Sequence, residues 1–231
     1  MSGVDRKPGP ASTPAAEASM QAYYAARAPE YDAVYLKPER QGDLRAIEQW
    51  LPPIFAGARV LEVACGTGYW TRVIAPVAAE VLALDSAPET MAIARLRVPA
   101  AHVRFVAGDA YALPRDAGRF DAAFAGFWFS HVPIARRVEF LRGLNAMLGP
   151  GARVVLLDNC QVEGSSSPVS ERDAEGNTWQ VRRLGDGSMH RVLKNFPSEA
   201  ELRSAVAGLG HGFALTRWPF YWACSYTGAA V

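Results

Sequence analysis

Apolar residues in this chain gather in short runs, and longer segments of helical character lie between them. Five runs are predicted to be strands: residues 59–64, 80–85, 102–106, 119–125 and 152–157. The first, with Val60, Leu61, Val63 and Ala64, suits a parallel strand that is buried on both faces. The segments between them carry helix signals, such as Pro88 followed by Glu89 in the first turn of one helix. Another predicted helix spans 133–148, and Gly149-Pro150-Gly151 is expected to end it. This alternation predicts an α/β fold with a doubly wound parallel sheet.

The region before the first strand has two parts. Residues 1–17 are rich in Pro, Gly, Ala and Ser and are predicted to be a disordered tail, which leaves a single domain over 18–231. Residues 18–55, called the lid below, combine a tyrosine-rich helix that Pro29 is expected to end with an amphipathic helix at 42–55. The tyrosine rings are expected either to pack on the edge of the domain or to close over bound ligands.

An insertion, residues 159–195, interrupts the alternation after the fifth strand. Two short strands at 178–183 and 188–194, joined by a turn-rich link, predict a small β-hairpin there. The helical pattern resumes where Ser198 and Glu201 form a capping box.

The first strand leads directly into Gly66-Thr67-Gly68, a turn that lets the backbone approach a ligand closely at the start of a helix. The second strand ends in Asp85, 17 residues after Gly68, where Rossmann-like folds place a ribose-binding carboxylate. A dinucleotide-binding enzyme would be expected to have a third glycine at position 71. That residue is Thr71, so the pattern disfavours a dinucleotide.

These motifs resemble those of the class I S-adenosylmethionine-dependent methyltransferases. The resemblance is carried by Glu62 to Gly68, Asp85-Ser86, Gly108-Asp109-Ala110 and Phe120 to Phe124. It implies a Rossmann-like, seven-stranded sheet with an antiparallel C-terminal hairpin, formed by residues 209–217 and 220–226. It also implies S-adenosylmethionine as cofactor and S-adenosylhomocysteine as product. The sequence shows no clustered Asp, Asn and Glu set that would imply a metal. The cofactor-binding positions that match are Tyr24, Tyr31, Glu62, Ala64, Gly66, Gly68, Trp70, Asp85, Ser86, Asp109, Ala110 and Phe127.

Within this set, charge suggests individual roles. We expect Glu62 to bind the methionine ammonium, Asp85 to accept both ribose hydroxyls, and Asp109 to face the adenine amino group. The structural alternative for Glu62 and Asp85 is a helix cap or a surface ion pair. Trp70 is expected either in the core or on the wall of the cofactor site. In many small-molecule methyltransferases a similar tyrosine-rich segment closes over the methionine end of the cofactor.

The substrate side is expected to follow the fourth strand and to include the insertion. His131 is interpreted either as a general base or as a histidine that holds a loop carbonyl. The basic residues of the insertion either discourage aggregation of edge strands or clamp an anionic substrate. The candidate substrate-binding residues are Tyr35, Trp128, Arg182, Arg183, Arg191 and Lys194.

A narrower resemblance favours the anion clamp. The run Tyr23 to Asp32, the motif Gly66 to Arg72, His131-Val132-Pro133 and the block Val181 to Lys194 are similar to the phosphonate O-methyltransferases of bacterial phosphonopeptide biosynthesis. The resemblance implies that Arg183 and Lys194 hold the acid group of the substrate. With His131 they form the predicted catalytic set.

The sequence therefore predicts an enzyme that methylates a carboxylate or phosphonate oxygen of a small anionic metabolite by in-line displacement. The alternatives are N- or O-methylation of an aromatic amine or phenol, with His131 or a tyrosine as base, and a non-catalytic cofactor-binding module. A net charge of +1 and the lack of a basic stripe or long apolar run argue against nucleic acid and membrane as partners. Three scattered cysteines and no secretory pattern predict a cytoplasmic protein. We expect it to be a monomer or a homodimer.

Overall fold

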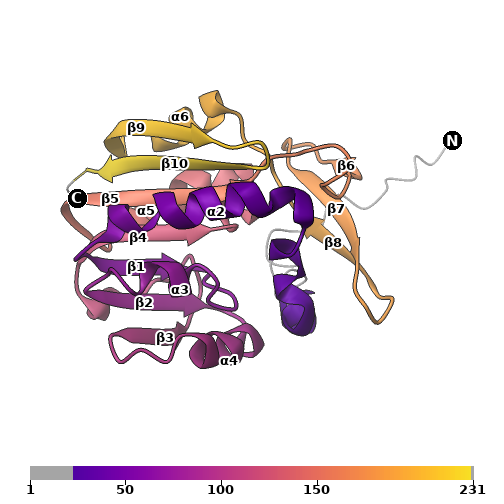
Figure 1. The fold of residues 1–231 in the computed structure, drawn as a ribbon. Coiled ribbons are helices and arrows are strands. Elements are labelled where there is room, and N and C mark those ends of the chain that lie inside the picture. Colours follow the sequence, from indigo (N-terminus) through magenta and orange to yellow (C-terminus); the bar gives the residue numbers. More distant parts are fainter. Residues whose placement is uncertain (1–22, 230–231) are drawn as a thin grey trace, which may run out of the picture.

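The structure is a computed structural model that describes residues 23–229. Its centre is a seven-stranded sheet with the order β3-β2-β1-β4-β5-β10-β9 (Figure 1). Strands β1 to β5 are parallel, and β10 runs antiparallel to both β5 and β9. This topology confirms the predicted doubly wound sheet with an antiparallel C-terminal hairpin. The strands are β1 (Arg59–Val63), β2 (Glu80–Asp85), β3 (Val103–Ala107), β4 (Phe120–Gly126), β5 (Leu148–Asn159), β9 (Gly210–Arg217) and β10 (Tyr221–Gly228).

The chain reverses its direction of travel across the sheet between β1 and β4. From β1 it proceeds outward to β2 and β3, then returns to β4 on the other side of β1. The crevice at the carboxyl ends of two such strands is where open α/β sheets bind ligands. Ala64 and Phe127 directly follow β1 and β4, and both are non-glycine residues with positive φ angles, 57° and 59°. Backbone strain of this kind clusters at ligand sites, which supports placing the site here.

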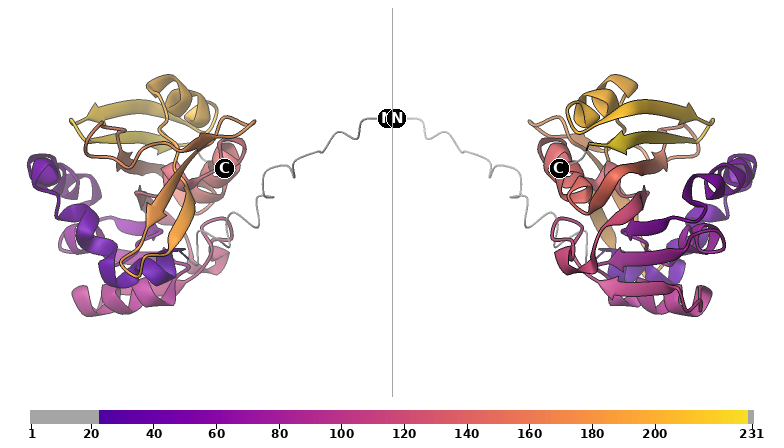
Figure 2. Two further views of the ribbon diagram at one scale, coloured as in Figure 1. Left: turned by 90° about the vertical axis from the view of Figure 1, so that its right-hand side faces the viewer. Right: turned by 90° about the vertical axis from the view of Figure 1, so that its left-hand side faces the viewer.

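Helices cover both faces of the sheet, as the two side views in Figure 2 show. One face packs against Leu44, Ile47 and Phe55, and the other packs against Phe140 and Leu202. The α-helices are α2 (Gln41–Trp50), α3 (Thr71–Ile74), α4 (Pro88–Arg97), α5 (Arg137–Asn145) and α6 (Glu199–Val206). The 3-10 helices are η1 (Ala28–Tyr35), η2 (Pro38–Arg40), η3 (Pro52–Phe55), η4 (Arg115–Ala117), η5 (Phe129–His131) and η6 (Ile134–Arg136).

Several boundaries differ from those predicted. The helix expected over 133–148 is η6 followed by α5, which ends at Asn145. Gly149-Pro150-Gly151 does not precede β5 but lies inside it, where the register against β4 shifts. A bulge accommodates turn residues within a strand, with Gly151 at a φ of +75°, so these residues bend β5 without ending it.

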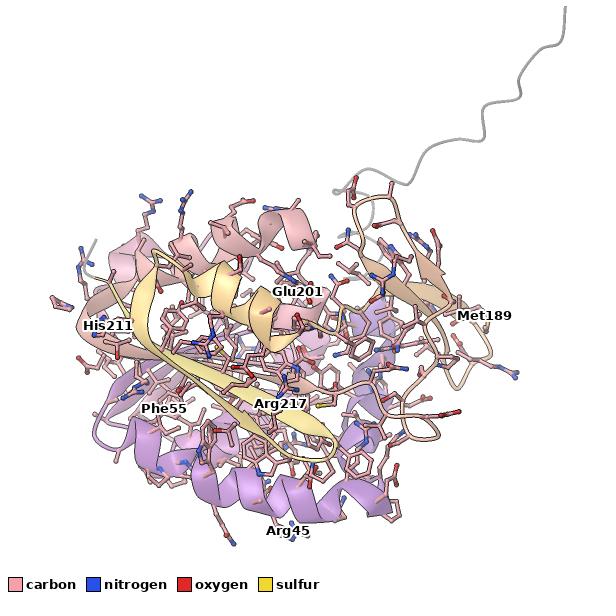
Figure 3. All side chains as sticks on the ribbon, turned by 90° about the horizontal axis from the view of Figure 1, so that it is seen from above. Arg45, Phe55, Met189, Glu201, His211 and Arg217 are labelled. Atoms are coloured by element: carbon pink, nitrogen blue, oxygen red, sulfur yellow. The ribbon has the colours of Figure 1, made fainter. Side chains whose placement is uncertain are left out.

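The insertion forms a separate three-stranded antiparallel sheet, of which the sequence predicted two strands. It consists of β6 (Glu171–Arg172), β7 (Thr178–Arg183) and β8 (Met189–Leu193). The two residues of β6 are exposed and give no alternating pattern, so the sequence carries no signal for this strand. Figure 3 shows Met189 on a hairpin that stands away from the main sheet.

Residues 23–35 of the lid lie beside this hairpin, at the edge toward which the parallel strands point, whereas α2 packs on a face of the main sheet (Figures 1 and 2). Residues 23–27 are helical, but Pro29 does not end the segment, because it lies in the first turn of η1 and the chain continues to Tyr35. The predicted tail at residues 1–17 lies outside the described residues.

Candidate functional site

The glycine turn after β1 fits tightly between the lid and α4. Gly66 and Gly68 have φ angles of 55° and 73°, which favour glycine. A Cβ atom at Gly66 would lie 2.8 Å from the hydroxyl oxygen of Tyr31, and one at Gly68 would lie 3.0 Å from the Cβ of Ala94. The turn therefore leaves no room for side chains, which suits a close approach of backbone to a ligand.

Glu62 presents a buried carboxylate at this turn. The residue is 1% exposed, and its Oε2 atom has no hydrogen-bond partner among residues 23–229. Burial raises the pKa of Glu62 to about 8, while the neighbouring Thr71 hydroxyl acts in the opposite direction. An unpartnered buried carboxylate is costly unless a cationic or donor group joins it. Glu62 therefore favours a ligand group that is cationic or donates a hydrogen bond.

Two further carboxylates follow the ends of the neighbouring strands. Asp85 ends β2, and its oxygens accept hydrogen bonds from the backbone N–H of Gly66, at 2.8 Å, and of Ala87, at 2.9 Å. Burial raises the pKa of Asp85, and these hydrogen bonds oppose that effect. Asp109 is exposed beyond β3 and accepts from the backbone N–H of Tyr111 at 2.9 Å. Glu62, Asp85 and Asp109 thus lie at or just beyond the carboxyl ends of the adjacent strands β1, β2 and β3.

Polar contacts join the lid segment to the glycine turn. The Thr67 hydroxyl donates to Asp32 at 2.6 Å, and Arg97 of α4 donates to Asp32 and to both the hydroxyl and the carbonyl of Thr67. Further along the chain, Arg40 of the lid donates to the Ser165 hydroxyl of the insertion at 2.9 Å.

Aromatic stacking fixes the middle of the lid. Tyr35 is 5% exposed and stacks on Tyr69, with ring centroids 3.6 Å apart, and on Phe127 at 5.6 Å. Phe127 in turn stacks on Tyr221 at 5.7 Å. Trp70 is buried and contacts the same rings edge-on. Tyr35 and Trp70 therefore have packing roles in this arrangement.

A cavity of about 410 Å³ lies between the lid, the loop at 165–168, strand β7 and the residues that follow β8. Its lining includes six basic residues, Arg27, Lys37, Arg40, Arg182, Arg183 and Lys194, and one acidic residue, Glu30. We call it the basic cavity. Among the described residues, five of the six have no ion pair with a carboxylate, the exception being Lys194.

His131 is buried at the wall of the basic cavity and bonds through both ring nitrogens. Nδ1 lies 2.5 Å from the carbonyl oxygen of Leu193, and Nε2 lies 2.8 Å from the hydroxyl of Tyr24. Because a carbonyl only accepts, Nδ1 carries the proton and Nε2 accepts the Tyr24 proton. Burial, with Lys194 and Arg182 nearby, lowers the pKa of His131 well below its usual value, so the ring is neutral. His131 thus holds the carbonyl of Leu193, the last residue of β8, and faces Tyr24.

Lys194 is buried and fully hydrogen-bonded. Its Nζ donates to the Ser130 hydroxyl at 2.6 Å, to Asp158 at 2.7 Å and to the Oδ1 of Asn159 at 3.1 Å. An ammonium group has three protons, so these acceptors account for all of them. Burial lowers the pKa of Lys194, whereas the Asp158 charge opposes that shift.

The three arginines of the hairpin have different surroundings. Arg182 pairs across the hairpin with His190 and lies on the face that leads to Lys194, where its Nε and an Nη donate to Gln180. Arg183, the next residue, is exposed on the opposite face, although it reaches the cavity. The structure therefore separates the predicted clamp pair, Arg183 and Lys194, onto two faces.

Arg191 and Trp128 lie outside the cavity lining. Arg191 forms a two-contact ion pair with Glu171 and stacks over the ring of Trp179, 3.5 Å from its centroid. Trp128 contacts the rings of Tyr111 and Phe140.

Sequence reasoning missed Arg27, Arg40 and Asn159, which line the basic cavity. Asn159 ends β5, so its place at the carboxyl end of a strand was a usable signal. Among the described residues, no group of three His, Cys, Asp or Glu side chains could hold a metal ion. In the same part of the chain, no helix has the length and apolar character needed to cross a membrane.

Comparison with known proteins gives consistent matches. Residues 60–151 match the family described as "Methyltransferase domain". Demethylmenaquinone methyltransferase of Thermus thermophilus is 37% identical over 139 residues, 57% of this chain and 61% of that protein. Ubiquinone biosynthesis O-methyltransferase of Xanthomonas axonopodis pv. citri is 32% identical over 160 residues, 67% of this chain and 63% of that protein. The chain thus spans less than two thirds of the length of these curated relatives.

Among solved structures, the DhpI-SAH complex and the DhpI-SAM-HEP complex both have a TM-score of 0.78. Their sequence identities to this chain are 29% and 30%, and each alignment covers 94% of this chain and 99% of the DhpI chain.

Proposed function

This chain belongs to the class I S-adenosylmethionine-dependent methyltransferases, and we propose that it methylates a carboxylate or phosphonate oxygen of a small anionic metabolite. The observation that carries the proposal is the basic cavity, in which five cationic side chains lack an acidic partner among the described residues. Cations without counter-charges favour an anionic ligand, and Arg is well suited to acid groups. The resemblance to phosphonate O-methyltransferases supports the same substrate class.

The cofactor supplies an electrophilic methyl group on a sulfonium centre. We propose that Glu62 binds the ammonium of the cofactor and that Asp85 binds its ribose hydroxyls. The backbone of the glycine turn would lie beside the methionine and ribose, with Asp109 and Ala110 beside the adenine. Ala64, Ser86, Tyr24, Tyr31, Trp70 and Phe127 are proposed to complete this site. The orphaned Oε2 of Glu62 and the lack of space at Gly66 support this assignment.

On the substrate side, the chain's task is to orient an oxygen that is already ionised. Such an oxygen needs no general base, so positioning supplies most of the catalysis, an effect worth up to about 7–11 kcal/mol in well-aligned systems. We propose that Arg182, Arg183 and Arg27 attract and hold the acid group. Lid closure, stabilised by Asp32 and Thr67, would exclude water from the reacting atoms.

The test is transfer of labelled methyl groups from S-adenosylmethionine to a panel of small carboxylic and phosphonic acids, phenols and amines. We expect labelling of acids, and mild alkali to release the label from carboxyl esters but not from phosphonate esters. Arg182→Gln should raise the KM for the acid at least ~10-fold, since hydrogen bonds to charged groups contribute about 1.5–3 kcal/mol. Arg191→Gln is the matched control, because Arg191 pairs with Glu171 away from the cavity. Labelling confined to amines or phenols would contradict the proposal.

One observation favours a second function, methylation of a phenol or aromatic amine. His131 accepts the Tyr24 proton inside the cavity wall, so this pair could take up a proton from a neutral nucleophile. If this function is correct, His131→Ala abolishes activity on phenols while Arg182→Gln is tolerated. Cofactor binding without transfer to any panel compound would instead favour a binding module.

We further propose that the enzyme acts in the cytoplasm on free small molecules, as a monomer or homodimer, without a nucleic-acid or membrane partner. Its near-neutral net charge supports this view.

A further inference from the structure

We propose that Asn159 binds the acid group of the substrate through its side-chain amide and acts as a specificity-determining residue. This inference rests on the proposed function and deepens it. Asn159 is the last residue of β5, at the carboxyl edge of the sheet, and it lines the basic cavity. It belongs to none of the sequence motifs described above.

The orientation of the amide is fixed by Lys194. The Lys194 ammonium can only donate, so the amide oxygen Oδ1 must face it, at 3.1 Å. The amide nitrogen Nδ2 then points elsewhere, and it is buried without a hydrogen-bond partner among residues 23–229. An unsatisfied buried donor costs about 1–3 kcal/mol, and an oxygen of a bound ligand would remove that cost.

Lys194 itself has no proton to offer such a ligand. Its three protons are committed to Ser130, Asp158 and Asn159, and Asp158 is 0% exposed. Drawing Lys194 toward a substrate would leave a buried carboxylate without its counter-charge, which costs several kcal/mol. The donor that this network leaves free is therefore the Asn159 amide, because the ammonium is used to hold it.

The nearby cation complements the amide. Arg182 lies on the same face of the hairpin as Lys194, and its Nε and one Nη donate to the neutral side chain of Gln180. Among the described residues, its positive charge has no carboxylate partner. Arg182 supplies attraction to any anion, whereas Asn159 supplies a directional donor. Together they select an acid that has at least two oxygens, so that Arg182 and Asn159 can bind one of them while another is methylated.

The experiment compares steady-state kinetics of Asn159→Asp, Asn159→Ser and wild-type enzyme on the acid that wild-type enzyme labels best. Asn159→Asp is isosteric but replaces the donor by a negative charge, so its KM for the acid should rise about 100-fold. Asn159→Ser keeps a small donor, and we expect a rise of about 10-fold. The affinity of both variants for S-adenosylmethionine, measured by calorimetry, should match that of wild type.

Gln161→Glu is the matched charge control. Gln161 lies two residues further along, is exposed, and is not among the residues that line the cavity, so its KM should change less than about threefold. An unchanged KM in both Asn159 variants, with wild type active on acids, would overturn the role of Asn159 and leave the proposed function intact. If wild type labels no acid, the proposed function fails and the inference fails with it. If Asn159→Asp does not fold, the KM of Asn159→Ser decides the question.

Discussion

Glu62→Gln should uncouple cofactor binding from proton release. Free carboxylates of this type have a pKa of 4.5, and burial raises that of Glu62 to about 8 in the folded protein. At pH 6.5 more than nine in ten folded molecules then carry a proton on Glu62. An ammonium group placed beside the carboxylate favours its ionised form, so binding should release close to one proton per site. The glutamine variant has no such proton to lose.

The same shift sets the pH dependence of stability. Between pH 4.5 and about 8 the folded state holds a proton that the unfolded chain has lost, so the free energy of unfolding falls as pH rises through this window. The slope reaches about 1.4 kcal/mol per pH unit, and the total is of the order of 5 kcal/mol. The stabilising contribution is complete below pH 4.5 and is lost above about 8. Glu62→Gln should flatten this part of the profile.

The assay is titration calorimetry of S-adenosylhomocysteine at pH 6.5 in buffers that differ in ionisation enthalpy. The slope of observed against buffer enthalpy counts the released protons, and we expect nearly one for wild type and nearly none for the variant. Urea unfolding from pH 5 to 9 gives the stability profile of each protein. A wild-type slope of zero, or equal slopes in both proteins, would refute the assignment of Glu62 to the ammonium.

Three further predictions concern local structure. Gly66→Ala should destabilise the fold by about 1–3 kcal/mol and weaken cofactor binding, because its Cβ would meet the Tyr31 hydroxyl at a positive φ. Gly143→Ala, in open space on α5, is the control and should be neutral or slightly stabilising; urea unfolding measures the stability of both variants and calorimetry their cofactor binding. Tyr35→Ala should cost about 3–5 kcal/mol in thermal unfolding by removing the central ring of the stack, and Tyr35→Phe far less; equal effects would contradict a packing role. Ser198→Ala should cost about 1 kcal/mol by removing the observed cap of α6, with methyl transfer unchanged.

Local patterns predicted the sheet well, because strand burial and helix caps leave signals within a few residues. The capping box at Ser198 and the early Pro88 of α4 are both present as predicted. Gly149-Pro150-Gly151 was misleading, since the same residues serve a turn or a bulge and the pairing of β5 with β4 decides between them.

The site was less predictable than the fold. The places of Glu62 and Asp85 could be predicted because strand ends position them, but the surroundings of Lys194 could not. Asp158, which pairs with Lys194, lies 36 residues away in sequence. Nothing in the sequence around Asp158 distinguishes it from the other residues at the end of β5. Such partnerships arise from tertiary packing, so a sequence pattern can locate a charge without revealing whether it is free.

The lid touches both halves of the site through one short segment. Tyr31 covers Gly66 on the side proposed to bind the cofactor, and Tyr24, seven residues earlier, bonds His131 on the side proposed to bind the substrate. A segment of this length that is held at both places cannot open one half while leaving the other undisturbed. Cofactor and substrate should therefore bind with positive and reciprocal cooperativity: each ligand raises the affinity for the other by the same factor, because each stabilises the same closed state.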